Sequence, residues 1–355
     1  MKRNINIFFY TVLLTAAIFS IFYLSSCEDG PTEPEIEPGR RDYTWKVDTL
    51  LAWSTYLLKM WGSSTTDVWA VGHGSTFDKT IWHYDGAKWI TDGVSKGIDP
   101  WCIYGFAHND VWIGGADGKI WHFNGNKWSE NLFYKEDVNY IYHDIIFMDI
   151  WGEQPNDIFA VGMIDSVSSA NEEFVFAIIM HYDGNKWNKV DISYTKGQLK
   201  KIRKDNYANS NYFINNFIVS LTNPDSAQYF SLSGNTINEI SHVENITQDL
   251  TVINSELIFS FDRSMYIYKN NKFNLIATNP FENAWNALYG RNRKDLIWMM
   301  SDGLTHYNGT DFKYILNTNN KSWSDGVVFE NEVFFLANDF YNDNTNNIVY
   351  HGQLK

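Results

Sequence analysis

Three stretches of the chain repeat one ten-residue pattern: TIWHYDGAKW (Thr80–Trp89), KIWHFNGNKW (Lys119–Trp128) and IIMHYDGNKW (Ile178–Trp187). In each stretch, two short apolar segments flank an Asp-Gly or Asn-Gly pair. These dipeptides favour the type I′ hairpin turn, because both of its central residues need positive φ. The pattern therefore predicts a β-hairpin that recurs along the chain, and with it an internal structural repeat.

A second pattern precedes these hairpins and sets the period of the repeat. Its clear copies are MWGSSTTDVWAVG (60–72), IYGFAHNDVWIGG (103–115), IWGEQPNDIFAVG (150–162) and LYGRNRKDLIWMM (288–300). The Trp/Tyr-Gly pairs are 43, 47 and 138 residues apart, and 138 is three times 46. Two weaker copies are therefore expected between them, at 214–237 and 254–273, and a last copy begins at ENEVFFLA (330–337). The count is seven units.

Four short strands in each unit of 43 to 47 residues indicate the blade of a β-propeller. We therefore expect an all-β fold, with a single propeller of seven four-stranded blades over residues 43–355. The chain ends after a third strand, NIVYHGQLK (347–355), whereas YTWKVDTL (43–50) resembles a fourth. This N-terminal strand is predicted to complete the last blade and close the ring.

Several polar and aromatic residues recur at fixed places in the repeat. An acid or amide opens each second strand: Asp67, Asp110, Asp157, Asn216, Glu256, Asp295 and Glu332. One place in the third strand is histidine in five units: His83, His122, His181, His306 and His351. Equivalent places in different blades lie far apart around a ring, whereas zinc needs ligands within roughly 2 Å of one point. We interpret these histidines as structural and expect no cofactor.

Another recurring place, at the start of the fourth strand, is aromatic. It is filled by Trp45, Trp89, Trp128, Trp187, Phe273 and Phe312. We predict that these rings pack between blades, because a ring used for ligand stacking should lie in a loop and differ from blade to blade.

The N-terminus carries a targeting pattern. Lys2 and Arg3 precede an uncharged apolar run at 7–24, which is long enough that a retained membrane anchor is an alternative. The run ends in Leu-Ser-Ser-Cys at Cys27, which resembles the lipobox of bacterial lipoproteins. That resemblance implies a signal peptide at 1–26 and a lipidated Cys27 that carries palmitate and anchors the protein to the membrane.

The next segment, 27–42, is rich in acids and proline and predicts a flexible tether. Acidic residues directly after the lipidated cysteine resemble the surface-export signal of lipoproteins in the Bacteroidetes. The expected location is therefore the bacterial cell envelope, at the outer membrane, facing the periplasm or the cell surface.

The net charge argues against nucleic-acid binding, and the cysteine content argues against an internal disulfide. The formal net charge is −14 and no basic stripe offsets it, so nucleic-acid binding is not expected. After processing, Cys102 is the only other cysteine, so no internal disulfide is predicted. We expect a monomer that is held together by its core.

Long variable connections should carry any binding function. They join second to third strands and blade to blade, so they fall on one face of the propeller. The candidate ligand-binding residues on this face are His73, Asp78, Trp101, Tyr142, Glu172, Glu173, Trp285 and Asp339. Aromatic rings beside amides and carboxylates suit a glycan, a peptide or a protein; the alternative is that these are solvated loops.

A glycan-acting hydrolase or lyase is the alternative function. A glycosidase needs two carboxylates roughly 5–10 Å apart, and no spacing in the sequence singles out such a pair. Neither Gly-x-Ser-x-Gly nor His-Glu-x-x-His occurs. The loop NDFYNDNTNN (338–347) is rich in oxygen ligands, so calcium binding is kept as an alternative. The loop lacks the ligand spacing of an EF-hand.

The whole repeat resembles a bacterial group of secreted propellers built on IWG-x-x-x-x-D-V-W-A-V-G and HYDG-x-x-W, over residues 43–354. It is also similar to the ligand-sensing propellers of periplasmic regulators. The Asp-box motif of sialidases does not occur in the sequence. The resemblance implies a fold and a location but no reaction. The leading hypothesis is therefore a lipid-anchored binding propeller without catalysis.

Overall fold

The computed structural model describes residues 36–355, apart from 53, 75–76, 137–141, 194, 206–210, 219–224, 245–247, 319–320 and 340–345. The predicted signal peptide and Cys27 lie outside the described residues. One compact unit spans Pro38–Lys355. In the described part of the chain, no helix is long and apolar enough to cross a membrane.

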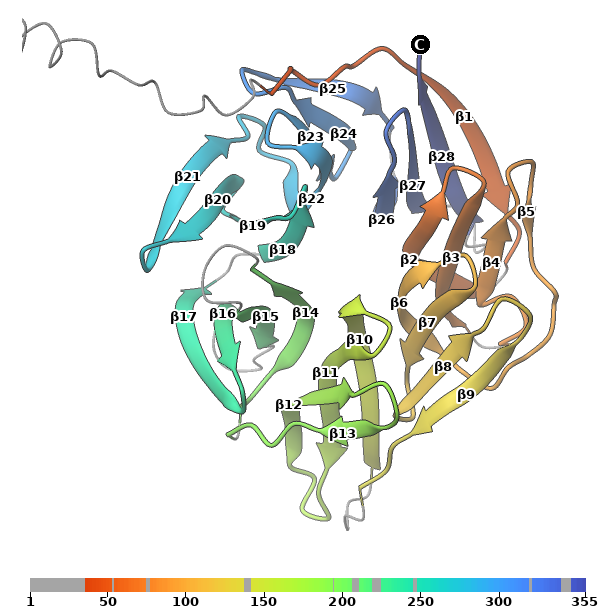
Figure 1. Ribbon diagram of the computed structural model, residues 1–355, viewed down its shortest axis with the longest axis vertical. Coiled ribbons are helices and arrows are strands. Elements are labelled where there is room, and N and C mark those ends of the chain that lie inside the picture. The colour runs from red at the N-terminus through yellow and green to blue at the C-terminus, as the bar shows by residue number, and fades with distance from the viewer. Residues whose placement is uncertain are drawn as a thin grey trace, which may run out of the picture. The chain divides into compact units, whose positions relative to one another are not determined.

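Seven separate four-stranded antiparallel sheets are arranged as a ring, which confirms the predicted seven-bladed β-propeller (Figure 1). Blade 1 consists of β2 (Thr55–Ser64), β3 (Asp67–Gly74), β4 (Ile81–Tyr84) and β5 (Trp89–Ile90). Blade 2 consists of β6 (Pro100–Ala107), β7 (Asp110–Gly115), β8 (Lys119–Phe123) and β9 (Trp128–Phe133). Blade 3 consists of β10 (Tyr142–Gln154), β11 (Asp157–Val167), β12 (Glu173–Tyr182) and β13 (Trp187–Lys189).

The remaining blades follow the same order from the innermost strand outward. Blade 4 consists of β14 (Gln198–Lys204), β15 (Tyr212–Ile218), β16 (Ser226–Ser233) and β17 (Thr236–Glu244). Blade 5 consists of β18 (Gln248–Ile253), β19 (Glu256–Phe261), β20 (Ser264–Lys269) and β21 (Lys272–Thr278). Blade 6 consists of β22 (Ala284–Asn292), β23 (Asp295–Met300), β24 (Gly303–Tyr307) and β25 (Phe312–Asn317).

Blade 7 joins the two ends of the propeller. It consists of β26 (Ser322–Val328), β27 (Glu332–Asp339), β28 (Asn346–Leu354) and β1 (Tyr43–Leu50). Strand β1 runs antiparallel to β28 in unbroken register from Tyr43 opposite Leu354 to Leu50 opposite Asn347 (Figure 1). The N-terminal strand therefore closes the ring, as predicted.

The hydrophobic core lies between blades. The buried apolar residues form seven clusters, and each cluster joins two consecutive blades. The recurring aromatics contribute to it as expected: Trp128 of blade 2 meets Trp69 of blade 1 edge-on at 5.5 Å, and Trp187 of blade 3 meets Trp112 of blade 2 at 6.0 Å. Each blade thus buries apolar side chains against both of its neighbours.

The recurring histidines hydrogen-bond within their own blades. His83 Nε2 lies 2.6 Å from Asp67 Oδ1, and the imidazole stacks on Trp69 at 4.2 Å. Four other blades repeat the contact, through the pairs His122–Asp110, His181–Asp157, His306–Asp295 and His351–Glu332. The motif ties the third strand to the start of the second.

Blade 4 departs from this motif, and the sequence alignment was wrong there. Ser231 stands in the histidine place and pairs with Phe213, so the residue that opens the second strand is Asn211 and not Asn216. Asn216 lies five residues further, near the opposite end of β15. The error arose because blade 4 has no Trp/Tyr-Gly pair to fix the register.

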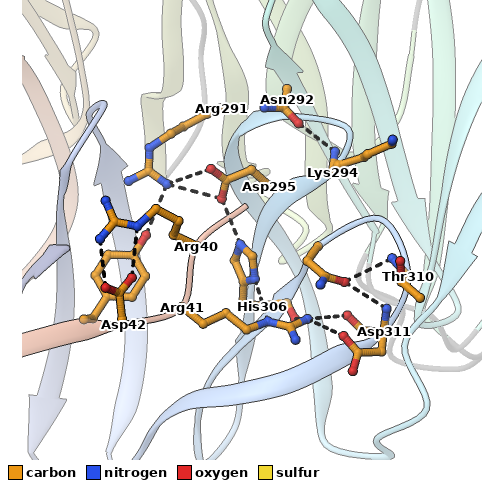
Figure 2. Close-up of polar contacts among 12 residues, drawn as sticks. Arg40, Arg41, Asp42, Arg291, Asn292, Lys294, Asp295, His306, Thr310 and Asp311 are labelled. Carbon is orange, nitrogen blue, oxygen red and sulfur yellow. Dashed lines mark hydrogen bonds and ion pairs between the residues drawn. The ribbon is translucent and has the colours of Figure 1, made fainter. Parts of the chain in front are cut away.

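In blade 6 the motif is buried beneath the segment that leads into β1 (Figure 2). Arg41 Nε donates to His306 Nδ1 at 3.0 Å, so the other ring nitrogen, Nε2, carries the proton and donates to Asp295. Arg291 also donates to Asp295, at 3.1 and 3.2 Å. The Gly39 amide donates to Lys294 O, so the chain contacts blade 6 before β1 begins.

Asp295 and Asp110 occupy the same place in two blades but differ in burial, which gives a matched test. His306 is 0% exposed, so Asp295→Ala should leave its Nε2–H without an acceptor and remove the carboxylate that pairs with Arg291, which should lower the free energy of unfolding by about 3–5 kcal/mol. In Asp110→Ala the half-buried His122 regains water, and the loss should be about 1–2 kcal/mol. Denaturant unfolding measures both, with the exposed Glu130→Ala as control; equal losses would contradict the structural role assigned to blade 6.

Candidate functional site

A cavity of about 850 Å³ lies at the centre of the ring, and all seven blades contribute to its lining. Its residues stand near the starts of innermost strands, such as Tyr56 and Trp285, and near the ends of second strands, such as His73 and Asn338. This is the end of the propeller that carries the long connections. The cavity is therefore built on the face where binding was expected.

β-Bulges in the innermost strands place residues at the cavity wall. In five of these strands the pairing register skips one residue at the level of the cavity, and this residue has no partner opposite it. A bulge of this kind bends the strand and redirects a side chain. All five skipped residues line the cavity: Leu58, Trp101, Met148, Lys200 and Ser324.

Aromatic rings form part of the wall. Tyr56, His73 and Trp101 make a continuous stack, with ring centroids 5.6 and 4.8 Å apart and with His73 between the other two. Trp285 is 45% exposed, and Trp323 lines the same cavity. The structure thus brings together three of the predicted residues, His73, Trp101 and Trp285.

Amide side chains form a second part of the wall; Asn215, Asn216 and Asn338 are buried, and Gln248 is half-buried. Their nitrogen ends are held by the protein: Asn216 Nδ2 donates to Gln228 Oε1 at 2.9 Å, and Asn338 Nδ2 donates to Ser324 Oγ at 2.7 Å. The four carbonyl oxygens are buried without a hydrogen-bond partner among the described residues. A buried acceptor without a donor is costly, so these amides are suited to a ligand or water that supplies donors.

Charged residues surround the axis next to these walls. Four cations, Lys59, Lys200, Lys201 and Arg203, share this region with three carboxylates, Asp149, Asp249 and Asp325. Two ion pairs are direct: Lys201 with Asp249 at 2.7 Å, and Arg203 with Asp149 at 2.5 Å.

The third carboxylate also has partners. Asp325 accepts from the Tyr289 hydroxyl at 2.6 Å and from the Met60 amide at 2.9 Å. Burial lowers the pKa of Lys59, but the negative charges of Asp325, Asp249 and Asp149 outweigh it and raise that pKa above its ordinary value. Lys59 is therefore compensated electrostatically by the three acids.

Lys200 and Lys59 both lack an ion pair and a side-chain hydrogen bond within the described residues, but only Lys59 is compensated by nearby carboxylates, whereas the charge that acts on Lys200 is the positive charge of Lys59. Burial, together with the positive charge of Lys59, lowers the pKa of Lys200 to about 8. At neutral pH most of these amines are charged, so the cavity presents one cation that no carboxylate of the described residues neutralises. Sequence reasoning missed Lys200, because nothing in its surroundings predicts the bulge that places it there.

The other predicted residues do not join the cavity lining. Asp78 is half-buried in the β3–β4 connection, where its carbonyl accepts from Thr91. Glu172 and Glu173 are exposed at the β11–β12 hairpin. Asp339 forms an ion pair with Lys321 at the end of β27, and the Tyr142 side chain lies outside the described residues. A ligand role for these residues stays a prediction.

The described residues give little support for a metal-binding site or for a reactive cysteine. No group of three or more His, Cys, Asp or Glu side chains within the described ranges is arranged to hold a metal ion. Much of the loop considered for calcium, residues 340–345, lies outside those ranges. Cys102 is buried, and this burial raises the pKa of its thiol, which lies 3.4 Å from Phe147 O.

Comparison with known proteins identifies the fold but no family. No family model matches the chain, and no curated protein matches it. Among solved structures, YCF48 bound to D1 peptide has a TM-score of 0.59 and 12% identity, over 90% of this chain and all of that one. YCF48 from Cyanidioschyzon merolae has a TM-score of 0.54 and 10% identity, over 85% of this chain and 98% of its own.

The WD40 propeller domain of Doa1 is also similar, with a TM-score of 0.56 and 10% identity, over 88% of this chain and 97% of that domain. At such identities the likeness shows the propeller architecture and nothing about ligand or activity.

Removing the charge of Lys200 and removing that of its neighbour Lys201 should change the free energy of unfolding in opposite directions. Because the folded-state pKa of Lys200 lies below its unfolded value, protonated Lys200 destabilises the fold, and Lys200→Met should raise the free energy of unfolding by about 1–3 kcal/mol at pH 7. This gain should be full below about pH 8 and vanish as pH approaches the ordinary lysine pKa near 10.5.

Lys201→Met is the matched control. It leaves Asp249 unpaired and should cost about 3 kcal/mol. Thermal unfolding of both variants from pH 7 to 10 is the measurement. A lower melting temperature for Lys200→Met at pH 7 would contradict the uncompensated charge.

Proposed function

We propose that this protein is a lipid-anchored binding propeller of the bacterial envelope that holds a peptide segment of another protein in its central cavity. The observation that supports this best is the composition of the cavity. Aromatic and aliphatic side chains, such as Trp101, Met148 and Phe217, stand beside buried amides with unused carbonyl oxygens. Apolar walls with a few fixed polar groups are typical of ligand sites.

A peptide suits this lining better than a glycan. Peptide N–H groups would supply the donors that Asn215, Asn216 and Gln248 lack, while apolar side chains of the ligand would pack on Leu58 and Met148. A glycan carries hydroxyl groups around its whole edge, and those facing the aliphatic wall would lose their hydrogen bonds. A structure of the similar propeller YCF48 contains a D1 peptide, so a propeller of this architecture accommodates such a ligand.

Catalysis has weaker support. Asp249 is the single carboxylate among the described residues that line the cavity, and it forms an ion pair with Lys201. A glycosidase needs a second carboxylate on the other side of its substrate. The predicted acids Glu172, Glu173 and Asp339 do not supply one at the cavity, so binding is the better interpretation of this site.

Trp101→Ala and Trp285→Ala should each weaken peptide capture, because each removes an aromatic side chain from the cavity. We expect a loss of about tenfold or more in affinity for each variant. The measurement is affinity selection of peptides from a proteolytic digest of envelope proteins, followed by calorimetry on the selected peptides. Leu275→Ala, an exposed apolar residue on the outer strand of blade 5, is the control and should bind normally. Capture of neutral glycans with no selected peptide would overturn the peptide assignment.

The membrane anchor is tested separately. Cys27→Ser should abolish incorporation of labelled palmitate and move the protein from the membrane fraction to the soluble fraction. Ser26→Ala is the control, since it keeps the cysteine and a small residue before it. Unchanged palmitate labelling in Cys27→Ser would refute lipidation at this residue, whereas loss of labelling with retention in the membrane would favour the uncleaved apolar anchor at 7–24.

A further inference from the structure

We propose that Lys200 binds the C-terminal carboxylate of the captured peptide, so that the cavity recognises a chain end and not an internal segment. This inference rests on the proposed peptide-binding function and names the part of the ligand that the cavity would recognise. The starting observation is the charge balance at the axis: among the described residues, four cations face three carboxylates, and every one of them except Lys200 is paired or compensated.

The charge of the ligand follows from this balance. One uncompensated cation calls for one negative charge, and a buried amine is stabilised by an anionic partner that supplies both charge and hydrogen-bond acceptors. A doubly charged phosphate would exceed the single positive charge and be repelled by Asp249, Asp149 and Asp325. A carboxylate matches the charge that Lys200 leaves open.

The position of Lys200 favours the end of a chain as the source of this carboxylate. The seven blades surround the cavity on all sides, and a second hollow of about 530 Å³, lined by Tyr104, Glu153 and Arg203, lies further along the innermost strands. Lys59 and Lys201 line the first cavity one residue further along their strands than Leu58 and Lys200, and Asp149 comes between the two hollows in strand order. A chain end entering from the loop-rich face can stop at Lys200, whereas an internal segment would have to enter and leave through the same mouth.

The neighbours of Lys200 fit a peptide terminus. The unused carbonyl oxygens of Asn215, Asn216 and Gln248 belong to blades 4 and 5, and Lys200 belongs to blade 4. They can accept from the last peptide N–H groups while the amine holds the carboxylate. The pKa of Lys200, lowered by burial and by Lys59, should rise again when the carboxylate binds.

The test uses the full chain in detergent and two forms of one mixed-sequence hexapeptide library, with free C-terminal carboxylates or with C-terminal amides. We expect the carboxylate library to bind about tenfold or more tightly, a preference that weakens above about pH 8 as free Lys200 loses its proton. Lys200→Met should remove this preference, Lys200→Arg should retain it, and the exposed Lys272→Met should leave it unchanged.

Each result distinguishes the carboxylate proposal from the function on which it rests. Equal binding of both libraries to the unaltered protein would overturn the role of Lys200 while leaving peptide capture intact. Binding of oligomeric galacturonic acid with no binding of peptides would show that the carboxylate comes from an acidic glycan, which overturns both the chain-end assignment and the peptide function. A carboxylate preference that persists in Lys200→Met would also overturn the proposal.

Discussion

The pairing of β1 with β28 is the constraint on which the rest of the structure depends. Each blade buries its apolar faces against the blades on either side, so an open array would leave two faces uncovered. Eight residues from the start of the propeller supply the missing strand of the last blade and turn the array into a ring. The central cavity exists because of this closure, since it needs the innermost strands of all seven blades around one axis.

Closure also determines the electrostatics of the site. Innermost strands that converge on one axis bring charged side chains from different blades together, and most of these are neutralised across a blade boundary, as in Arg203 with Asp149 and Lys201 with Asp249. Lys200 is left unneutralised and carries the cost of its own burial. A stable apo fold would favour an apolar side chain there, and the proposed binding of an anionic ligand would account for the charge.

The repeat made the architecture predictable, because its period, turn residues and incomplete ends are local properties of the sequence. Blade number and ring closure followed directly. The site was predictable only in part. His73, Trp101 and Trp285 lie near strand ends next to the variable connections, which are the parts of a repeat expected to carry binding residues. The other four skipped residues, including Lys200, depend on a register set by packing against the neighbouring strand. The misplacement of Asn216 has the same origin, since blade 4 lacks the signature that fixes register elsewhere.

The blades with the weakest repeat signature provide most of the polar cavity wall. Blade 4 has Ser231 where five blades have histidine, yet it contributes Lys200, Lys201, Asn215 and Asn216, and blade 5 contributes Gln248 and Asp249. Blades 1 to 3 keep the histidine–acid pair and contribute mainly aromatic and aliphatic side chains. A ring needs every blade for closure but does not need every blade to be alike. If the proposed function holds, the departures from the repeat are where recognition of the ligand is encoded, and in this chain they surround the amine of Lys200.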